Sequence, residues 1–114
     1  MTWMTWTTTL PLLLVSVANQ REHWSDRARR ASRHRGAAVV VPKGLPIPCV
    51  VTIERLYGGR GQAMDTDNLQ AACKALRDGI ADRLGVDDAD PRVTWRYAQT
   101  RAPEPGVRIT VEAA

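Results

Sequence analysis

The sequence predicts an α/β (α+β) domain, in which a small mixed sheet and two helices follow the order β-α-β-α-β-β. Apolar and polar residues alternate in Pro48–Tyr57, Arg92–Thr100 and Val107–Val111, as in half-buried strands. Apolar residues recur at three- and four-residue steps over Asp67–Leu84, as on one face of a helix. The 114 residues are enough for one domain with a modest core.

The N-terminal part of the chain begins with a polar segment and continues with an apolar one. Leu10–Val17 is short and apolar, which predicts the first strand, and Pro11 confines its first residues to an edge or a strand start. Met1–Thr9 is predicted to be a disordered leader, and it lacks the basic residues with which a signal peptide begins. The single folded domain is therefore expected over residues 10–114.

The first predicted helix covers Arg21–Arg35, with Asn19 as a candidate cap. Its narrow apolar face contains Trp24 and small residues, so we expect Trp24 in the core. His23 and His34 are expected to be surface or capping groups.

The second predicted helix has recognisable ends. Asp67 is a candidate N-cap, and Gly85 stands where a helix is commonly closed by glycine. The preceding Gly58–Ala63 segment is predicted to be a mobile connector, because no phosphate-loop lysine follows it. The last two strands are expected to pair around the Ala102–Gly106 loop.

The cysteine pattern and the apolar runs exclude several classes of protein. Cys49 and Cys73 are 24 residues apart, which fits neither a zinc ribbon nor a disulfide framework. Both are expected to be small buried residues in a reducing compartment. The longest apolar run, Leu10–Ala18, is too short to span a membrane, so no membrane partner is expected.

Charge is unevenly distributed along the chain. Arg21–Arg35 carries six arginines against Glu22 and Asp26, net +4, while Asp65–Asp90 has net −4. Arginine binds phosphates and carboxylates with its planar fork, which favours an anionic partner. A GC-rich genome also explains the choice of arginine over lysine, 14 against 2, but not the segregation of the two signs.

The acidic residues cluster at both ends of the second predicted helix. Asp65 and Asp67 stand at its start, and Asp87 and Asp88 follow its end. Mg²⁺ prefers oxygen ligands, polarises a phosphodiester and activates water, so such carboxylates favour a metal site. The alternative to a metal site is that Asp67 caps the helix and the other aspartates are solvated turn residues. A helix about 27 Å long keeps the clusters apart in one chain unless the chain folds back or a second subunit contributes.

Lys74 projects near Asp67 and Asp78 on a helical wheel. One interpretation is a surface ion pair with Asp78 four residues on. The other is a lysine that stabilises phosphate charge during a reaction.

The run from Met64 to Asp90 (MDTDNLQAACKALRDGIADRLGVDDAD) resembles the core of RusA-type Holliday-junction resolvases of bacteriophages and prophages. The shared features are a D-x-D-N-L entry to a helix, a lysine and an aspartate along it, and an aspartate pair after it. The upstream segment ANQREHW resembles that family's early asparagine and aromatic segment. The lysine, however, usually lies four residues after the second aspartate, where this chain has Ala71.

The resemblance implies a small homodimer that cleaves four-way DNA junctions with one or two Mg²⁺ ions per site, in the cytoplasm of a bacterial host cell. Asp65, Asp67 and Asp88 would bind metal and act in catalysis, with Asp87 as an accessory ligand. Lys74 would be the catalytic lysine. Backbone phosphates of the DNA would be held by Asn19, Arg21, Arg27, Arg30, Arg33 and Arg35.

Two other functions remain open at the level of sequence. One is a catalytically inactive relative that binds branched DNA. The other is an unrelated α/β domain whose acidic turns are solvated loops.

Overall fold

The structure is a computed structural model, and it describes residues 4–16 and 23–114. The chain divides into two compact units that alternate along the sequence. The sheet unit comprises Met1–Leu14, Leu45–Ala63 and Ala89–Ala114. The helical unit comprises Val15–Gly44 and Met64–Asp88.

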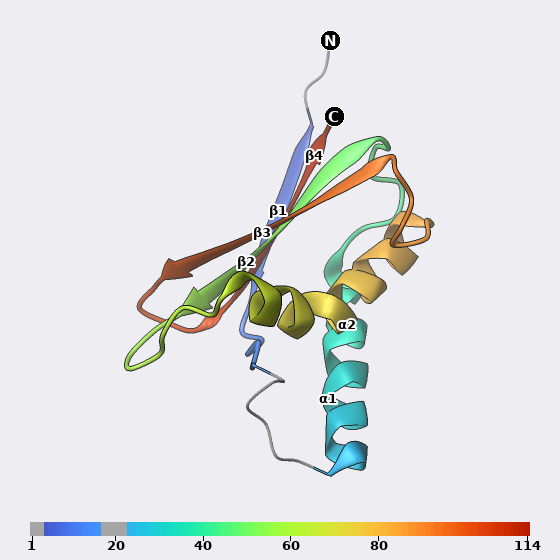
Figure 1. Ribbon diagram of the computed structural model, residues 1–114. Helices are drawn as coiled ribbons and strands as arrows, with labels where there is room; N and C mark the ends of the chain where they lie inside the picture. Colours follow the sequence, from blue (N-terminus) through green and yellow to red (C-terminus); the bar gives the residue numbers. More distant parts are fainter. Residues whose placement is uncertain (1–3, 17–22) are drawn as a thin grey trace. The chain divides into compact units, whose positions relative to one another are not determined.

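The predicted order β-α-β-α-β-β is confirmed, with one additional short 3₁₀ helix, η2 (Figure 1). The elements are β1 (Thr5–Leu10), α1 (Trp24–Ala37), η2 (Ala38–Val40), β2 (Cys49–Tyr57), α2 (Thr66–Leu84), β3 (Val93–Arg101) and β4 (Gly106–Ala113).

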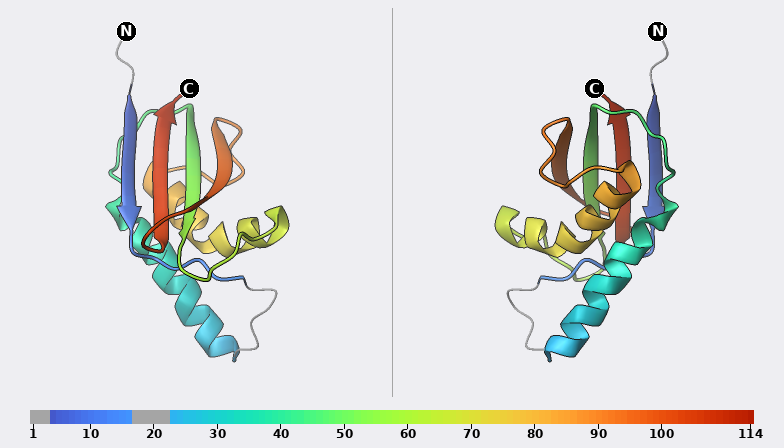
Figure 2. Two further views of the ribbon diagram at one scale, coloured as in Figure 1. Left: turned by 90° about the vertical axis from the view of Figure 1, so that its left-hand side faces the viewer. Right: turned by 90° about the vertical axis from the view of Figure 1, so that its right-hand side faces the viewer.

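The four strands form one mixed sheet in the order β1-β4-β2-β3 (Figure 2). β4 is antiparallel to both β1 and β2, whereas β2 and β3 are parallel. Parallel neighbours need a crossover connection, and α2 lies in the segment that joins them.

The predicted pairing of the last two strands is wrong, because β4 lies between β1 and β2. The reason is visible in the burial of their side chains. Val107, Ile109 and Val111 of β4 are almost inaccessible, and Ile109 stands opposite the buried Ile53 of β2. In β3 only Val93 is buried, which suits an edge position.

The first strand lies earlier in the chain than the apolar run predicts. β1 is formed by Thr5–Leu10, and Pro11–Ser16 has no regular structure. Threonines favour a strand because they are β-branched, and the Thr7 and Thr110 hydroxyls lie 3.1 Å apart across the β1–β4 pair. Of the leader predicted over Met1–Thr9, Thr5–Thr9 therefore lies in a strand, and Met1–Trp3 lies outside the described residues.

α1 begins later than predicted, and the side of the helix that is buried is not the predicted one. Its N-cap is His23, whose ring accepts a hydrogen bond from the Ser25 amide, while Asn19 lies outside the described residues. Trp24 is 74% exposed and His34 is 5% exposed, so both expectations for these side chains are wrong. The physical reason is the packing of α1 on α2, in which the side that bears His34 is covered.

α2 has the buried face that its periodicity predicts, because Leu69, Cys73, Leu76, Ile80 and Leu84 are all buried. The close crossing of α1 over α2 depends on a glycine. A Cβ atom on Gly79 would lie 2.8 Å from the Ala38 Cβ and nearer still to the Arg35 carbonyl oxygen.

The ends of α2 differ slightly from expectation. Asp65, not Asp67, is the N-cap, because the Asp65 side chain accepts from the Asn68 amide. Gly85 closes the helix with a φ of 75°, as predicted.

The two cysteines are buried thiols, as predicted, and burial raises the pKa of Cys49. Within residues 4–16 and 23–114, no helix is long and apolar enough to cross a membrane.

Candidate functional site

Two exposed carboxylates stand at the N-terminal end of α2. Asp65 accepts hydrogen bonds from the backbone amide of Asn68 at 2.8 Å and from its side-chain amide at 3.1 Å, which orients the carboxylate. Asp67 lies exposed in the first turn, and no hydrogen bond or ion pair to it is found among the described residues. Within residues 4–16 and 23–114, no arginine or lysine forms an ion pair with either carboxylate.

The carboxylates that follow α2 have different surroundings. The Arg77 guanidinium lies beside Asp88: Nη2 donates to the Asp88 carbonyl oxygen at 2.9 Å, and Nε lies 3.9 Å from the Asp88 carboxylate. Asp87 is exposed next to it. Arg77 thus fixes the chain immediately after the helix end and neutralises part of its charge.

Further along, Asp90 belongs to the sheet unit and binds Arg92 through two guanidinium nitrogens, at 3.0 and 2.7 Å. The Arg92 side chain and amide together lower the pKa of Asp90 to about 2. This carboxylate already has a cationic partner.

The structure does not bring the two predicted acidic clusters together within one chain. α2 has 19 residues and is therefore about 28 Å long, with Asp65 and Asp67 at one end and Asp87 and Asp88 beyond the other. No group of three or more histidine, cysteine or acidic side chains that could hold a metal occurs among residues 4–16 and 23–114. Among these residues, a single chain brings Asp65 and Asp67 together as a pair of carboxylates at the start of α2.

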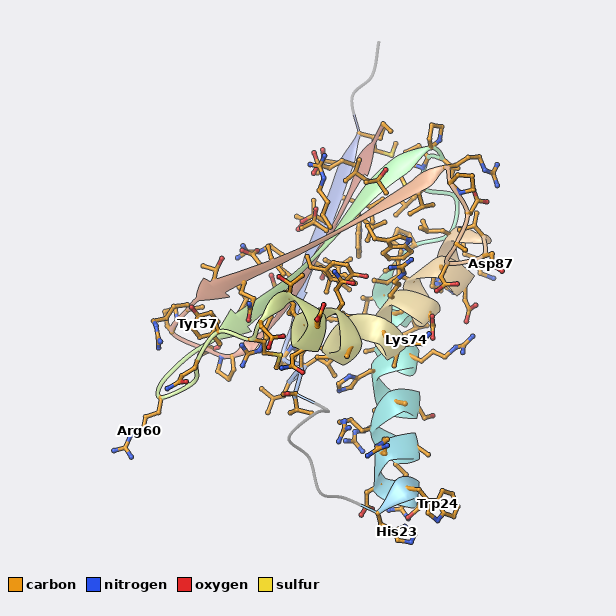
Figure 3. All side chains as sticks on the ribbon, in the orientation of Figure 1. His23, Trp24, Tyr57, Arg60, Lys74 and Asp87 are labelled. Carbon is orange, nitrogen blue, oxygen red and sulfur yellow. The ribbon has the colours of Figure 1, made fainter. Side chains whose placement is uncertain are left out.

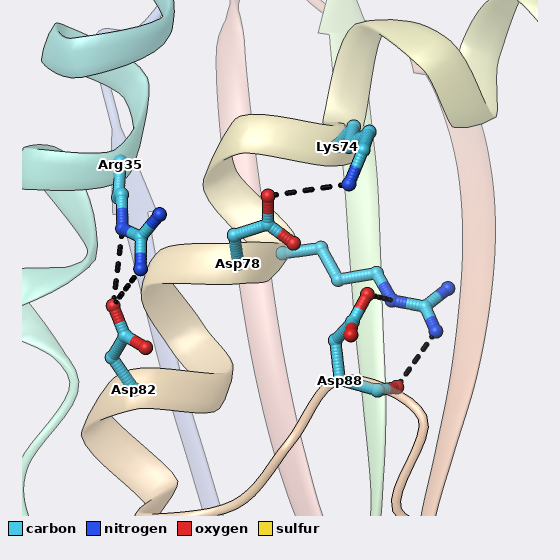
Figure 4. A network of polar contacts seen from close by, with 6 residues as sticks. Arg35, Lys74, Asp78, Asp82 and Asp88 are labelled. Atoms are coloured by element: carbon cyan, nitrogen blue, oxygen red, sulfur yellow. Dashed lines mark hydrogen bonds and ion pairs between the residues drawn. The ribbon is translucent and has the colours of Figure 1, made fainter.

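Lys74 lies about 10 Å along the helix axis from Asp67, because it follows Asp67 by seven positions. Its ammonium group is 3.3 Å from Asp78, and its side chain is 71% exposed (Figure 4). The ion pair that the four-residue spacing indicates is therefore present. Lys74 lines a groove together with residues of α1, described below.

The arginines of α1 fall into separate groups. Arg29 binds Asp26 at 2.8 Å, and Arg35 binds Asp82 at 2.6 Å, which raises the pKa of Arg35. Arg33 is exposed. The other predicted DNA-binding residues are Arg27 and Arg30, which face α2, and Asn19 and Arg21, which lie outside the described residues.

A groove of about 240 Å³ lies between α1 and α2. Its lining residues are Arg27, Arg30, Ala31, His34, Ala71, Ala72, Lys74, Ala75 and Asp78. The sequence does not predict this groove, since it depends on which faces of two separate helices meet. The feature of the sequence that could have indicated the groove is the group of alanines at 71, 72 and 75. Small side chains on one helix leave space between the longer side chains of two packed helices.

In the sheet unit, two guanidinium groups hold the loop between β2 and α2. They lie 5.2 Å (Arg55) and 4.9 Å (Arg101) from the centre of the Tyr57 ring. Arg55 donates to the Gln62 carbonyl, and Arg101 donates to the carbonyl oxygens of two loop glycines. Arg60 extends outward from the loop tip (Figure 3). The segment predicted to be a mobile connector is thus anchored at several carbonyl groups.

No family model matches this chain. A protein of Xylella fastidiosa (strain Temecula1 / ATCC 700964), described as an uncharacterized protein, is 36% identical to it over 78 residues. The match covers 61% of this chain and 51% of that protein, so the chain spans about half the length of the curated relative that it matches. The description of that relative states no activity.

Proposed function

We propose that the protein is a Mg²⁺-dependent, structure-selective endodeoxyribonuclease that resolves Holliday junctions or other branched DNA in the bacterial cytoplasm. The observation that supports this most is the exposed pair Asp65 and Asp67 at the start of α2, in the D-x-D-N-L context of RusA-type resolvases. The pair has no cationic partner among the described residues, unlike Asp88 and Asp90.

Asp65 and Asp67 suit a hard cation. Mg²⁺ is commonly bound through one or two carboxylates, with water and substrate phosphate as further ligands. The amide contacts of Asn68 leave the second lone pair of each Asp65 oxygen available. When bound, the ion would polarise the scissile phosphodiester and lower the pKa of water.

Asp87 and Asp88 would complete this site from a second copy of the chain. The length of α2 separates them from Asp65 and Asp67 in their own chain, so a homodimer is the arrangement that brings both clusters to one ion. Arg77 would set the position of Asp88 through its hydrogen bond to the Asp88 carbonyl.

A second function is favoured by one departure from the family pattern. Ala71 occupies the position where RusA-type resolvases usually have lysine, and Lys74 is already paired with Asp78. A protein that binds branched DNA without cutting it would tolerate this change.

A junction-cleavage assay distinguishes the two functions. A synthetic four-way junction and a linear duplex of the same length are incubated with the protein, with and without Mg²⁺. We expect nicks in the junction only when Mg²⁺ is present, and little cleavage of the duplex. Tight junction binding without any nicking would support the inactive alternative. The absence of both binding and nicking would overturn both.

A further inference from the structure

β1 forms one edge of the sheet and has none of the features that usually prevent an edge strand from pairing (Figure 2). Its six residues, Thr5–Leu10, include no charged residue and no proline, and they pair with β4 in continuous register without a bulge. A regular, uncharged edge of this kind is a template for a further strand. β3, at the other edge, carries the exposed Arg96 and Arg101.

Every second residue of β1 directs its backbone groups away from β4. The Ala113 amide donates to the Met4 carbonyl at 3.0 Å, and in an antiparallel ladder such bonded pairs alternate with non-bonded ones. Thr5, Thr7 and Thr9 therefore direct their N–H and C=O groups outward. In the part of the chain that the structure describes, no turn or loop backbone bonds to these three threonines, and their side chains are exposed.

The apolar core is incomplete at the same edge. Trp6 and Leu10 lie opposite the buried Val111 and Val107 of β4, on the core face of the sheet, yet both remain partly exposed. Met4, two positions before Trp6, is 45% exposed. A further strand would continue this face and remove apolar surface from water, which favours pairing.

We propose that β1 pairs in antiparallel fashion with β1 of a second copy of the chain across a two-fold axis, so that two four-stranded sheets join into one. The choice of a second copy rests in part on the proposed function, which needs two copies. It rests also on the strand itself, because an uncharged strand meets its own copy without like-charge repulsion. Two copies of β3 would instead bring their arginines together.

The alternation along β1 restricts the position of the axis. With the axis at Thr7 or at Thr8, the outward threonines of the two copies face one another, and each outward N–H meets an outward C=O. On the core face, Trp6 of one copy then lies opposite Thr8 or Leu10 of the other. Both arrangements pair the strands through the same backbone groups.

The first test removes an outward amide. Sedimentation of the full chain over a range of concentrations gives the dissociation constant of the dimer for the wild type and for Thr7→Pro. Proline is tolerated in an edge strand where its nitrogen faces solvent, so the fold should be retained. Two hydrogen bonds across the axis are lost, and the dissociation constant should rise at least about tenfold. Thr7→Ala is the control, because it also loses the Thr110 contact but keeps the amide.

The second test adds charge to the edge and leaves every amide in place. In Thr7→Lys/Thr9→Lys, lysines of the two copies face one another with the axis at either position, and the dimer should dissociate at lower protein concentrations of salt-free buffer than of high-salt buffer. The matched control is Thr94→Lys/Ala98→Lys, which adds the same charge to the same face of the sheet in β3 and should leave the dimer unchanged. Circular dichroism melting shows whether each variant is folded.

The outcomes separate this inference from the proposed function. A wild-type dimer that neither Thr7→Pro nor the β1 lysine pair weakens would overturn the β1 interface and leave the homodimer of the proposed nuclease in place. Dissociation by the β3 lysine pair alone would place the interface at β3 and would also overturn the proposal. A wild type that stays monomeric at the highest concentrations that sedimentation can follow would overturn it as well, whether or not the monomer cleaves junctions.

Discussion

The two ends of α2 carry similar numbers of carboxylates in very different surroundings. At the N-terminal end, Asp65 and Asp67 are exposed, and the contacts of Asp65 are amide hydrogen bonds. Beyond the C-terminal end, Asp88 lies beside Arg77, and Asp90 is bound by Arg92. A carboxylate that already has a guanidinium partner is stabilised less by a further cation. The comparison distinguishes Asp65 and Asp67, which have no cationic partner among the described residues, from Asp88 and Asp90, which each lie beside an arginine. The spacing of these aspartates in the sequence does not show this difference.

The largest expected change in stability concerns Gly79, which lets α1 cross the C-terminal half of α2. Gly79→Ala should lower the free energy of unfolding by about 2 kcal/mol, because its Cβ would overlap the Arg35 carbonyl and the Ala38 methyl group. Urea denaturation measures the change.

The control for that variant is Gly36→Ala in α1, whose added Cβ would meet nothing within 4 Å. It should stabilise the protein by about 0.5–1 kcal/mol, since alanine is the better helix former. Equal effects of the two substitutions would contradict the close crossing of the helices.

A smaller change in stability is expected at the N-terminal end of α2, where Asp65 is both a cap and a candidate ligand. Asp65→Ala should cost about 1 kcal/mol through loss of the cap, whereas Asp65→Ser should retain most of that stability. Both variants should lose Mg²⁺-dependent cleavage. Full activity in Asp65→Ser would show that Asp65 only caps the helix.

The smallest effect concerns the pKa of Asp90. Its pKa of about 2 lies below the ordinary 3.8, so the Arg92 contact contributes stability above about pH 4 that is lost as the pH falls through 2. Arg92→Gln should raise the pKa of Asp90 towards 3.8, as followed by NMR titration of the carboxyl carbon. An unchanged titration midpoint would mean that the ion pair is not formed in solution.

Much of the fold follows from local patterns. The periodic apolar residues of α2 and the glycine at its end are visible in the sequence, and so is the alternation in β2 and β3. Strand pairing is not local. The last two strands are close in sequence, yet β4 pairs with β1 and β2, because its buried side chains belong in the middle of the sheet.

The candidate site is only partly predictable for a similar reason. The D-x-D-N-L motif marks Asp65 and Asp67, and the basic composition marks the arginines of α1. Neither pattern shows that Arg35 is bound to Asp82 while Arg27 and Arg30 face a groove, or that His34 is buried there. Those properties arise from the rotation of α1 against α2, which also leaves Trp24 exposed.

The most direct test of the proposed nuclease is the Asp67→Asn substitution, assayed for binding and for cleavage of a four-way junction in Mg²⁺. Glu104→Gln is the control, since it removes one negative charge from an exposed loop between β3 and β4. We predict that Asp67→Asn lowers cleavage at least about 100-fold with junction affinity unchanged, because the metal would lose a ligand while the arginines of α1 would be unchanged. Cleavage by Asp67→Asn at the rate of the wild type and of Glu104→Gln would contradict the account.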